Sequence, residues 1–402
     1  MSGTDPLSGF TALGDRLEAA WRFRDYSEDA FPGICAEELD RTTALDGFDP
    51  FEFAAEAACA PELPRQEDIR AEFGQPPLTV YRTDRFYITL LYWQTSTTSV
   101  HEHGFQGAFR VASGASLHSA WRFDRTSEVS RHLLIGEVER TSSELLAVGD
   151  VRPIRPGAAG AHALFHLDHP SVTLVARTHA DPRAQPQYEY HPPSLAVDPF
   201  FVDPSMNRRI QLLRLLRRDE QRYRQCMCAS LETADLLSAV TLLFEACRTN
   251  VDDAFMSDLL AVVARQYPAA GEPLRSACRE AVHELQLTAL RQRVLDPGAR
   301  LVLALVLNDL DRETSLRLFG RRRPGDPVAA MADAIGTLLS EGEGIHVVEP
   351  IPEILRSLLR GEAANDVPEP SAGGFEAASV RTISAVLAGS PLIRKLLRPA
   401  TV

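Results

Sequence analysis

The sequence lacks the features that assign many proteins to a class at once. No apolar run approaches the ~20 residues that span a bilayer, so we expect no membrane-spanning helix. The N-terminal segment MSGTDPLSGFTALGD has neither the basic region nor the apolar region of a signal peptide. We therefore expect a cytoplasmic protein that works away from the membrane.

Cysteine is scarce and scattered. The chain has six cysteines, and the closest pair in sequence, Cys226 and Cys228, has no second pair with which to complete a zinc site. Regularly spaced cysteines would predict a disulfide framework, but none is visible. We interpret the six as reduced, buried thiols.

Positive charge is in deficit as well. The net charge is −13, and residues 1–75 hold seventeen acidic residues against six arginines. Nucleic-acid phosphates are bound by concentrated basic surfaces, so this balance argues against a nucleic-acid partner. The basic cluster Arg208–Arg218 has leucines at helical spacing, which is typical of an amphipathic helix with a solvated face.

Several common catalytic motifs are absent. The chain has no GxxxxGK[ST] phosphate loop and no GxSxG nucleophile turn. The segment His283–Leu287 reads HELQL, so it lacks the second histidine of an HExxH zinc helix. The C-terminal segments hold too few glutamates and histidines at paired spacing for a di-iron helical bundle.

What the chain does contain is a change of pattern along its length. Residues 1–75 are acidic and helical in period, and we expect them to pack on the next domain. Residues 76–182 contain ten short β-branched or aromatic segments separated by turn residues. Many short strands in one domain predict an antiparallel β-barrel, and a jelly roll fits their number.

The second half of the chain has a different pattern. Residues 183–204 are rich in proline and aromatic residues, which predicts a connector lying against a domain surface. Residues 205–402 have apolar residues at helical spacing with short breaks, which predicts an all-α domain. The expected fold class is therefore α+β and multidomain, with a β-barrel followed by helices.

Three histidines stand out within the predicted barrel. His101 and His103 are separated by one residue, and side chains at i and i+2 of a strand share a face. His162 opens another predicted strand, after the turns at Gly149–Asp150 and Pro156–Gly157. Two histidines on one face and a third from a neighbouring strand make a metal site with open positions, which suits Fe, Cu, Ni or Zn.

These two stretches resemble the two motifs of the cupin superfamily. The first motif is HxH followed by an apolar strand ending in glycine. The second is Gly-Asp, a strand, a Pro-Gly turn, a histidine and a polar residue four positions later. The matching positions are His101, His103, Gly114, Gly149, Asp150, Pro156, Gly157, His162 and His166.

One cupin ligand has no counterpart in this chain. Many cupins place a metal-binding glutamate after HxH, where most family spacings point to Gly107 or Ala108 here. Gln106 lies near that position. The missing glutamate favours a three-histidine site.

Within the superfamily, the stretch from Leu78 to Pro193 is similar to the thiol dioxygenases of cysteine dioxygenase type, through YRTDRFYITLLYWQTSTTSVHEHG. The resemblance implies Fe(II) held by the three histidines, with O2 and the substrate at the vacant positions. It also implies an arginine that binds the substrate carboxylate. Arg82, beside Tyr81, is the first candidate and Arg85 the second.

The chain departs from that family at two further positions. The family's catalytic tyrosine lies on the strand after the third histidine, where this chain reads RTHADP, so His179 falls near the tyrosine's place. The cysteine that some members crosslink to that tyrosine corresponds to Ala108. The identity of the substrate therefore does not follow from the resemblance.

The surroundings of the three histidines can be predicted in part. Neutral imidazoles leave the metal charge uncompensated, so an anionic ligand is favoured. Each ligand also needs an acceptor for its other N–H, and Gln106, His118 and His166 are the candidates for this outer layer. Glu102 points to the opposite face from its neighbours and is a poor candidate for a ligand.

Two functions fit these observations. The first is an Fe(II)-dependent oxygenase that uses O2 to oxidise an anionic small molecule or peptide-like substrate, with a thiol as our first choice. The second is a cupin that holds a metal or ligand without turnover and transmits a signal through a helical interaction or regulatory domain. The helical half would cap the pocket, admit a larger substrate or form a homodimer.

Overall fold

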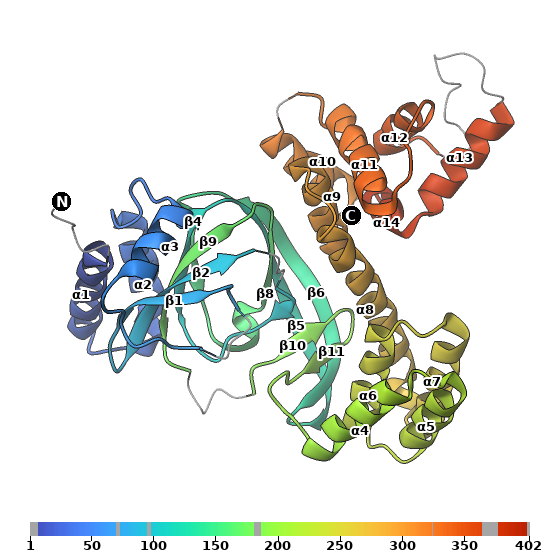
Figure 1. The fold of residues 1–402 in the computed structure, drawn as a ribbon, viewed down its shortest axis with the longest axis horizontal. Coiled ribbons are helices and arrows are strands. Elements are labelled where there is room, and N and C mark those ends of the chain that lie inside the picture. Colours follow the sequence, from blue (N-terminus) through green and yellow to red (C-terminus); the bar gives the residue numbers. More distant parts are fainter. Residues whose placement is uncertain are drawn as a thin grey trace. The chain divides into compact units, whose positions relative to one another are not determined.

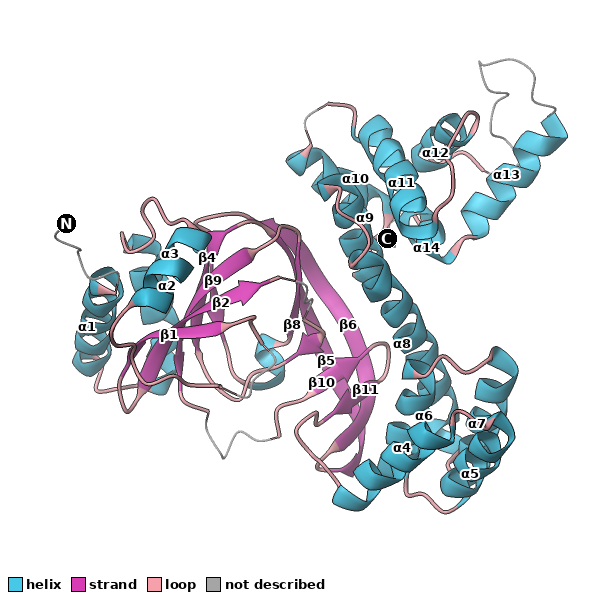
Figure 2. Ribbon diagram, in the orientation of Figure 1, coloured by secondary structure: helices cyan, strands magenta, loops and turns pink. Residues whose placement is uncertain are grey.

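The computed structural model describes residues 7–69, 73–94, 98–180, 186–323, 325–363 and 377–399. Antiparallel strands dominate the first half of the chain and helices the second half (Figure 1, Figure 2), which confirms the α+β prediction. By their contacts, the residues form two compact units, 1–282 and 283–402. No helix in the described ranges has both the length and the apolar character that crossing a membrane requires.

Five strands form the first sheet, in the order β1-β2-β9-β4-β7. Their bounds are β1 Pro77–Arg82, β2 Phe86–Trp93, β9 Ser171–Thr178, β4 Gly107–Ser113 and β7 Val151–Ile154. Both faces of this sheet are buried, because Leu174 and Ala176 of β9 pack in one apolar cluster and Val175 packs in another. Burial on both faces explains why β2 reads as an almost continuous apolar run.

Three helices cover the outer face of this sheet (Figure 1). They are α1 Ser8–Phe23, α2 Phe31–Arg41 and α3 Pro50–Cys59. Leu13 and Leu17 recur at helical spacing on α1, and both are fully buried in one cluster with Phe86 of β2. Asp49 caps α3 by accepting hydrogen bonds from the amides of Phe51 and Glu52.

The second sheet closes into a ring, in the order β10-β11-β6-β5-β8-β3. Its strands are β3 Val100–His101, β5 Ser116–Ser130, β6 Leu133–Leu146, β8 His162–His166, β10 Glu189–His191 and β11 Leu195–Val197. The strands β5 and β6 form a long hairpin with several register irregularities. The ring brings β3 and β8 side by side, with His101 directly opposite His162.

Two details of the ring differ from the sequence-based expectation. The pattern predicts separate strands in HLLIGEVER (residues 132–140) and ELLAVG (residues 144–149), but Leu133–Leu146 form the single strand β6. The polar residues between them stay paired with β5, as Ser143 opposite Ser119 shows. The segment 183–204, expected as a connector, contributes β10 and β11 to the ring.

Helices follow from residue 204 onward. They are α4 Pro204–Leu216, α5 Glu220–Glu232, α6 Leu236–Arg248, α7 Asp253–Gln266, α8 Gly271–Arg291, α9 Pro297–Leu307, α10 Arg312–Arg322, α11 Pro327–Glu343, α12 Ile351–Arg360, α13 Ala377–Gly389 and α14 Pro391–Arg394. An aspartate caps the N-terminus of most of them by accepting a backbone amide. These caps are Asp203, Asp219, Asp235, Asp252, Asp296, Asp311 and Asp326.

The strands and the first of these helices share a core. Leu133 of β6 and Leu195 of β11 are fully buried in one apolar cluster with residues of α5 and α6, including Met227 and Leu243. The compact unit 1–282 accordingly contains α4–α7 together with the barrel. The domain limits expected from sequence, with a boundary at 204/205, stay a prediction.

Candidate metal centre

Three histidines converge where β3 and β8 run side by side. His101 ends β3, His103 lies just beyond it and His162 begins β8. One ring nitrogen from each can be chosen so that all three atoms lie within 4.8 Å of one another. The Nε2 atoms of His103 and His162 are 3.0 Å apart. The register that pairs His101 with His162 therefore places all three imidazoles around one point.

The protonation state of these imidazoles suits a cation. His101 and His162 are buried and His103 is partly buried. Burial lowers the pKa of His101. Burial, reinforced by neighbouring histidines, holds the pKa of His103 and His162 well below the usual range. The neutral imidazole, which has the free electron pair of a metal ligand, is therefore the stable form of each.

Outer contacts fix the orientation of two of the rings. The Nδ1–H of His101 donates to the backbone carbonyl of Ser99 at 2.8 Å, which leaves Nε2 free as a ligand atom. The Nδ1 atom of His162 lies 3.2 Å from Nε2 of His118, and Nδ1 of His118 lies 3.1 Å from Glu144. His118, expected as a residue of the outer layer, thus contacts one of the three histidines directly.

The backbone leaves no place for a carboxylate ligand at the usual cupin spacing. A side chain at Gly107 would put its Cβ 2.0 Å from the carbonyl oxygen of Ala176, because β4 and β9 approach closely there. Ala108 is fully buried in the apolar cluster that the first sheet forms with α1 and α2, which includes Leu13. Neither position can direct a glutamate at the histidines, so the donor group found in the described residues consists of the three imidazoles.

Glu102 faces away from the metal centre, as expected. Its carboxylate accepts a hydrogen bond from the hydroxyl of Tyr190 at 2.5 Å and another from the amide of Tyr188 at 3.3 Å. Burial raises the pKa of Glu102. The residue ties β3 to the segment that leads into β10, on the face opposite the histidines.

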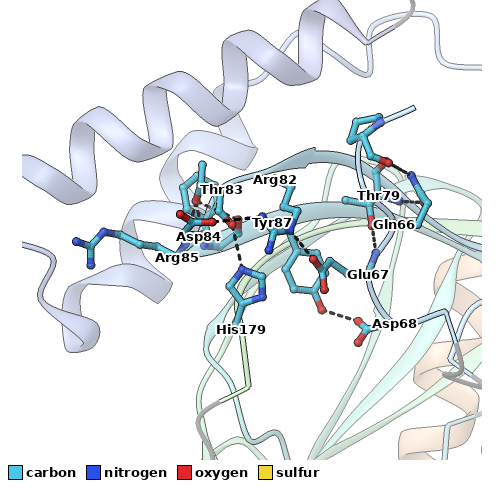
Figure 3. A network of polar contacts seen from close by, with 12 residues as sticks. Gln66, Glu67, Asp68, Thr79, Arg82, Thr83, Asp84, Arg85, Tyr87 and His179 are labelled. Atoms are coloured by element: carbon cyan, nitrogen blue, oxygen red, sulfur yellow. Dashed lines mark hydrogen bonds and ion pairs between the residues drawn. The ribbon is translucent and has the colours of Figure 1, made fainter. Parts of the chain in front are cut away.

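The arginines and the histidine expected around the substrate lie in a polar network at the β1–β2 turn (Figure 3). Arg82 donates to Glu67 at 2.5 Å and to Asp84 at 3.4 Å, and the ring of His179 lies 3.1 Å from the carbonyl oxygen of Thr83. Figure 3 shows Arg85 pointing away from this group.

The partners of Arg85 and Tyr81 lie in the N-terminal helical segment. The guanidinium of Arg85 lies 4.0 Å from the ring centroid of Tyr26, and the hydroxyl of Tyr81 donates to Asp15. The contacts described for these four residues thus join them to residues other than the three histidines. The roles expected for Arg82, Arg85, Tyr81 and His179 stay predictions.

The remaining expected residues take different positions. His166 lies at the far end of β8 from His162, fully buried, 2.9 Å from the hydroxyl of Ser116 and stacked on Trp93. Gln106 is buried, and its backbone bonds to Thr178 of β9. His118, by contrast, lies within hydrogen-bond distance of His162.

Sequence reasoning missed Arg177. Its guanidinium carbon lies 3.2 Å from the ring centroid of Phe105, and that ring lies 4.5 Å from His103. Its charge contributes to the low pKa of His103. The alternation of β9 is the signal that could have found it, because Val175 faces the barrel interior and Arg177 shares its face.

Arg177 is a cation that the interior of the barrel partly surrounds. Its side chain is 16% exposed and lies 3.4 Å from the carboxylate of Asp68. Burial lowers its pKa, because a charged guanidinium loses hydration there. A guanidinium of this kind, which packs on the same phenylalanine as His103, has the chemistry to bind an anion.

Comparison of the chain with models of known protein families and with curated proteins finds no match, so the geometry of the site carries the functional argument.

Proposed function

We propose that His101, His103 and His162 bind one Fe(II) ion, and that the protein is a cupin-type oxygenase that uses O2 to oxidise an anionic thiol. The observation that carries this proposal is the convergence of one nitrogen from each of three neutral imidazoles within 4.8 Å, in a sheet with no room for a glutamate side chain at Gly107. Three protein ligands leave positions open for other molecules. Cu, Ni and Zn suit the same nitrogen donors, so the metal's identity is part of the test.

The neutral ligand set favours an anionic substrate. Three imidazoles leave the full charge of a divalent ion uncompensated, which favours a thiolate as a further ligand. Iron bound there would supply the redox chemistry that O2 requires. The overall reaction is RSH + O2 → RSO2H, in which both oxygen atoms end on sulfur and the thiol proton ends on the sulfinic acid.

Arg177 gives the substrate a second point of attachment. Its guanidinium can bind a carboxylate of the substrate, and Phe105 packs against both this guanidinium and His103. The protein chain would thus hold the two ends of a thiol-bearing amino acid or peptide. Arg82 and Arg85 stay the alternative residues for binding the substrate carboxylate, and variants of the three arginines distinguish them.

The first experiment measures metal binding and oxygen uptake. The protein is purified without oxygen, loaded with Fe(II), and assayed for bound metal and for O2 consumption with cysteine, a cysteine-containing peptide and a thiol without a carboxylate. We expect one metal ion per chain and uptake with at least one thiol. His101→Ala and His162→Ala should lose both metal and uptake.

A matched control comes from His132, which bonds to Asp198 in the same compact unit and lies outside the histidine cluster. His132→Ala should keep the metal. Bound iron without uptake of O2 by any thiol would reject the oxygenase and favour the non-catalytic binding protein. Unchanged metal content in both His101→Ala and His162→Ala would remove the site itself.

A further inference from the structure

We propose that Glu144 positions His162 for the metal through His118, by a chain of hydrogen bonds that fixes the tautomer of both rings. Arg152 anchors the far end of this chain. The inference rests on the proposed function, since it takes the three histidines as the metal ligands. It adds His118, Glu144 and Arg152, which would influence metal binding through His162 without contacting the metal.

The strand register builds the chain. His118 of β5 lies directly opposite Glu144 of β6 and opposite Leu164 of β8 on its other side. His162 is two residues before Leu164 on β8, so its side chain is the diagonal neighbour of His118. The resulting distances are 3.2 Å from Nδ1 of His162 to Nε2 of His118, and 3.1 Å from Nδ1 of His118 to Oε1 of Glu144.

The chemistry of each group sets the direction of these bonds. The Nε2 atom of His162 faces His103, so it is the atom that binds the metal and Nδ1 carries the proton. That proton is donated to Nε2 of His118, which leaves the proton of His118 on Nδ1. An ionised carboxylate only accepts hydrogen bonds, so Glu144 completes a chain with a single direction.

Arg152 keeps Glu144 ionised and in place. Its Nε and Nη2 atoms donate to the two carboxylate oxygens at 2.8 and 2.5 Å, which is the paired geometry of a strong guanidinium–carboxylate contact. These bonds, with a further one from His118, lower the pKa of Glu144 to about 2. Arg152 belongs to β7, so the contact joins the two sheets across the barrel.

The consequence concerns the ligand strength of His162. A carboxylate at the end of the chain makes the imidazole a stronger electron donor and holds its ring at one rotation. His101 achieves its orientation with a backbone carbonyl, which side-chain substitution cannot remove. The ring of His162 is oriented by the side chains of His118 and Glu144. Substitution of Glu144 can therefore change the metal affinity without replacing a ligand.

The test uses Co(II) alone as the probe, with the full-length protein. The affinity is measured by competition with a chelator, and the coordination is read from the visible ligand-field spectrum. Glu144→Gln keeps an oxygen acceptor without charge, and Glu144→Ala removes both. We expect affinity losses of about 10-fold for Glu144→Gln and up to about 100-fold for Glu144→Ala, with a changed spectrum.

The control is Glu139→Gln on the same strand. Glu139 forms an ion pair with Arg122 at 2.7 Å, and among the described residues no hydrogen bond or ion pair joins it to His118 or His162. Its affinity and spectrum should match those of the unmodified protein. The thermal midpoint of each metal-free variant separates loss of fold from loss of affinity, because a purely structural role of Glu144 would move only that midpoint.

The outcomes distinguish this inference from the proposed function. If the unmodified protein binds no Co(II), the metal site fails and the inference fails with it. If the unmodified protein binds Co(II) and both Glu144 variants match Glu139→Gln in affinity and spectrum, only the inference is overturned. A graded loss of affinity with a spectral change supports it.

Discussion

Two arginines offer different positions for the substrate anion, and single substitutions decide between them. Arg177→Gln removes the cation that packs on Phe105 next to His103. We expect KM to rise by about 30-fold, which corresponds to about 2 kcal/mol for a charged hydrogen bond. Arg82 is held by Glu67 and Asp84, so Arg82→Gln should change KM much less. Steady-state O2 uptake at varied thiol concentration measures both. The reverse order would restore Arg82 as the anchor.

The buried histidines also make the stability of the metal-free protein depend on pH. The pKa of His103 and His162 is lowered in the folded state, so below the unfolded value of about 6.5 the unfolded chain binds more protons. Stability therefore falls as pH decreases from about 6.5, by about 1.4 kcal/mol per pH unit for each histidine.

Urea unfolding of the metal-free protein between pH 7 and pH 5 measures this slope. His103→Gln should reduce this slope, because a glutamine at that position does not titrate. His132→Ala serves as the comparison outside the cluster. An identical slope in His103→Gln and the unmodified protein would contradict the assignment.

At the scale of single residues, the sequence predicts the three-histidine group and only part of its surroundings, namely His118. The i, i+2 spacing of His101 and His103, followed by His162, was sufficient to predict the three-histidine group that the structure shows. The outer contacts depend on which strands become neighbours. His118 reaches His162 because β5 pairs with β8, and sequence spacing cannot reveal this pairing.

At the scale of elements, most strands of the barrel were predicted, whereas the two short strands of the proline-rich segment and the continuity of β6 were not. The strands β10 and β11 lie in a proline-rich segment, and prolines usually argue against strands. Both strands are three residues long, which is short enough to fit between those prolines. The polar run within β6 indicated a turn, whereas its pairing with β5 supplies the backbone hydrogen bonds that keep it extended.

The close approach of β4 and β9 has a consequence for the chemistry of the site. Gly107 permits this approach, since any side chain there would overlap the carbonyl of Ala176. The absence of a glutamate at this spacing is therefore built into the sheet as well as the sequence. A fourth protein ligand cannot be gained by substituting Gly107 without moving two strands apart.

At the scale of the whole molecule, the order of strands and then helices was evident in the sequence, but the partner of each apolar stripe was not. The leucines of α4–α7 predict that these helices pack on an apolar surface, but they do not identify the element that provides it. In the structure, Leu133 and Leu195 of the barrel are buried in the same cluster as Met227 and Leu243. The first helices thus contribute to the core that supports the ring of strands.

This shared core predicts how the chain responds to truncation. A chain ending at residue 204 would expose Leu133 and Leu195, which are fully buried, and lose the helices that cover them. Burial of one such side chain contributes about 1.5–3 kcal/mol, so loss of the whole cluster exceeds the stability of a typical domain. We expect residues 1–204 to aggregate when expressed.

A chain ending at residue 291, after α8, should stay monodisperse and bind the same amount of metal as the full chain. Size-exclusion chromatography and metal analysis of the three chains measure this, with the full chain as the reference. A folded, metal-binding chain of residues 1–204 would instead make the barrel an independent domain, because the covering helices would then contribute nothing essential to the ring.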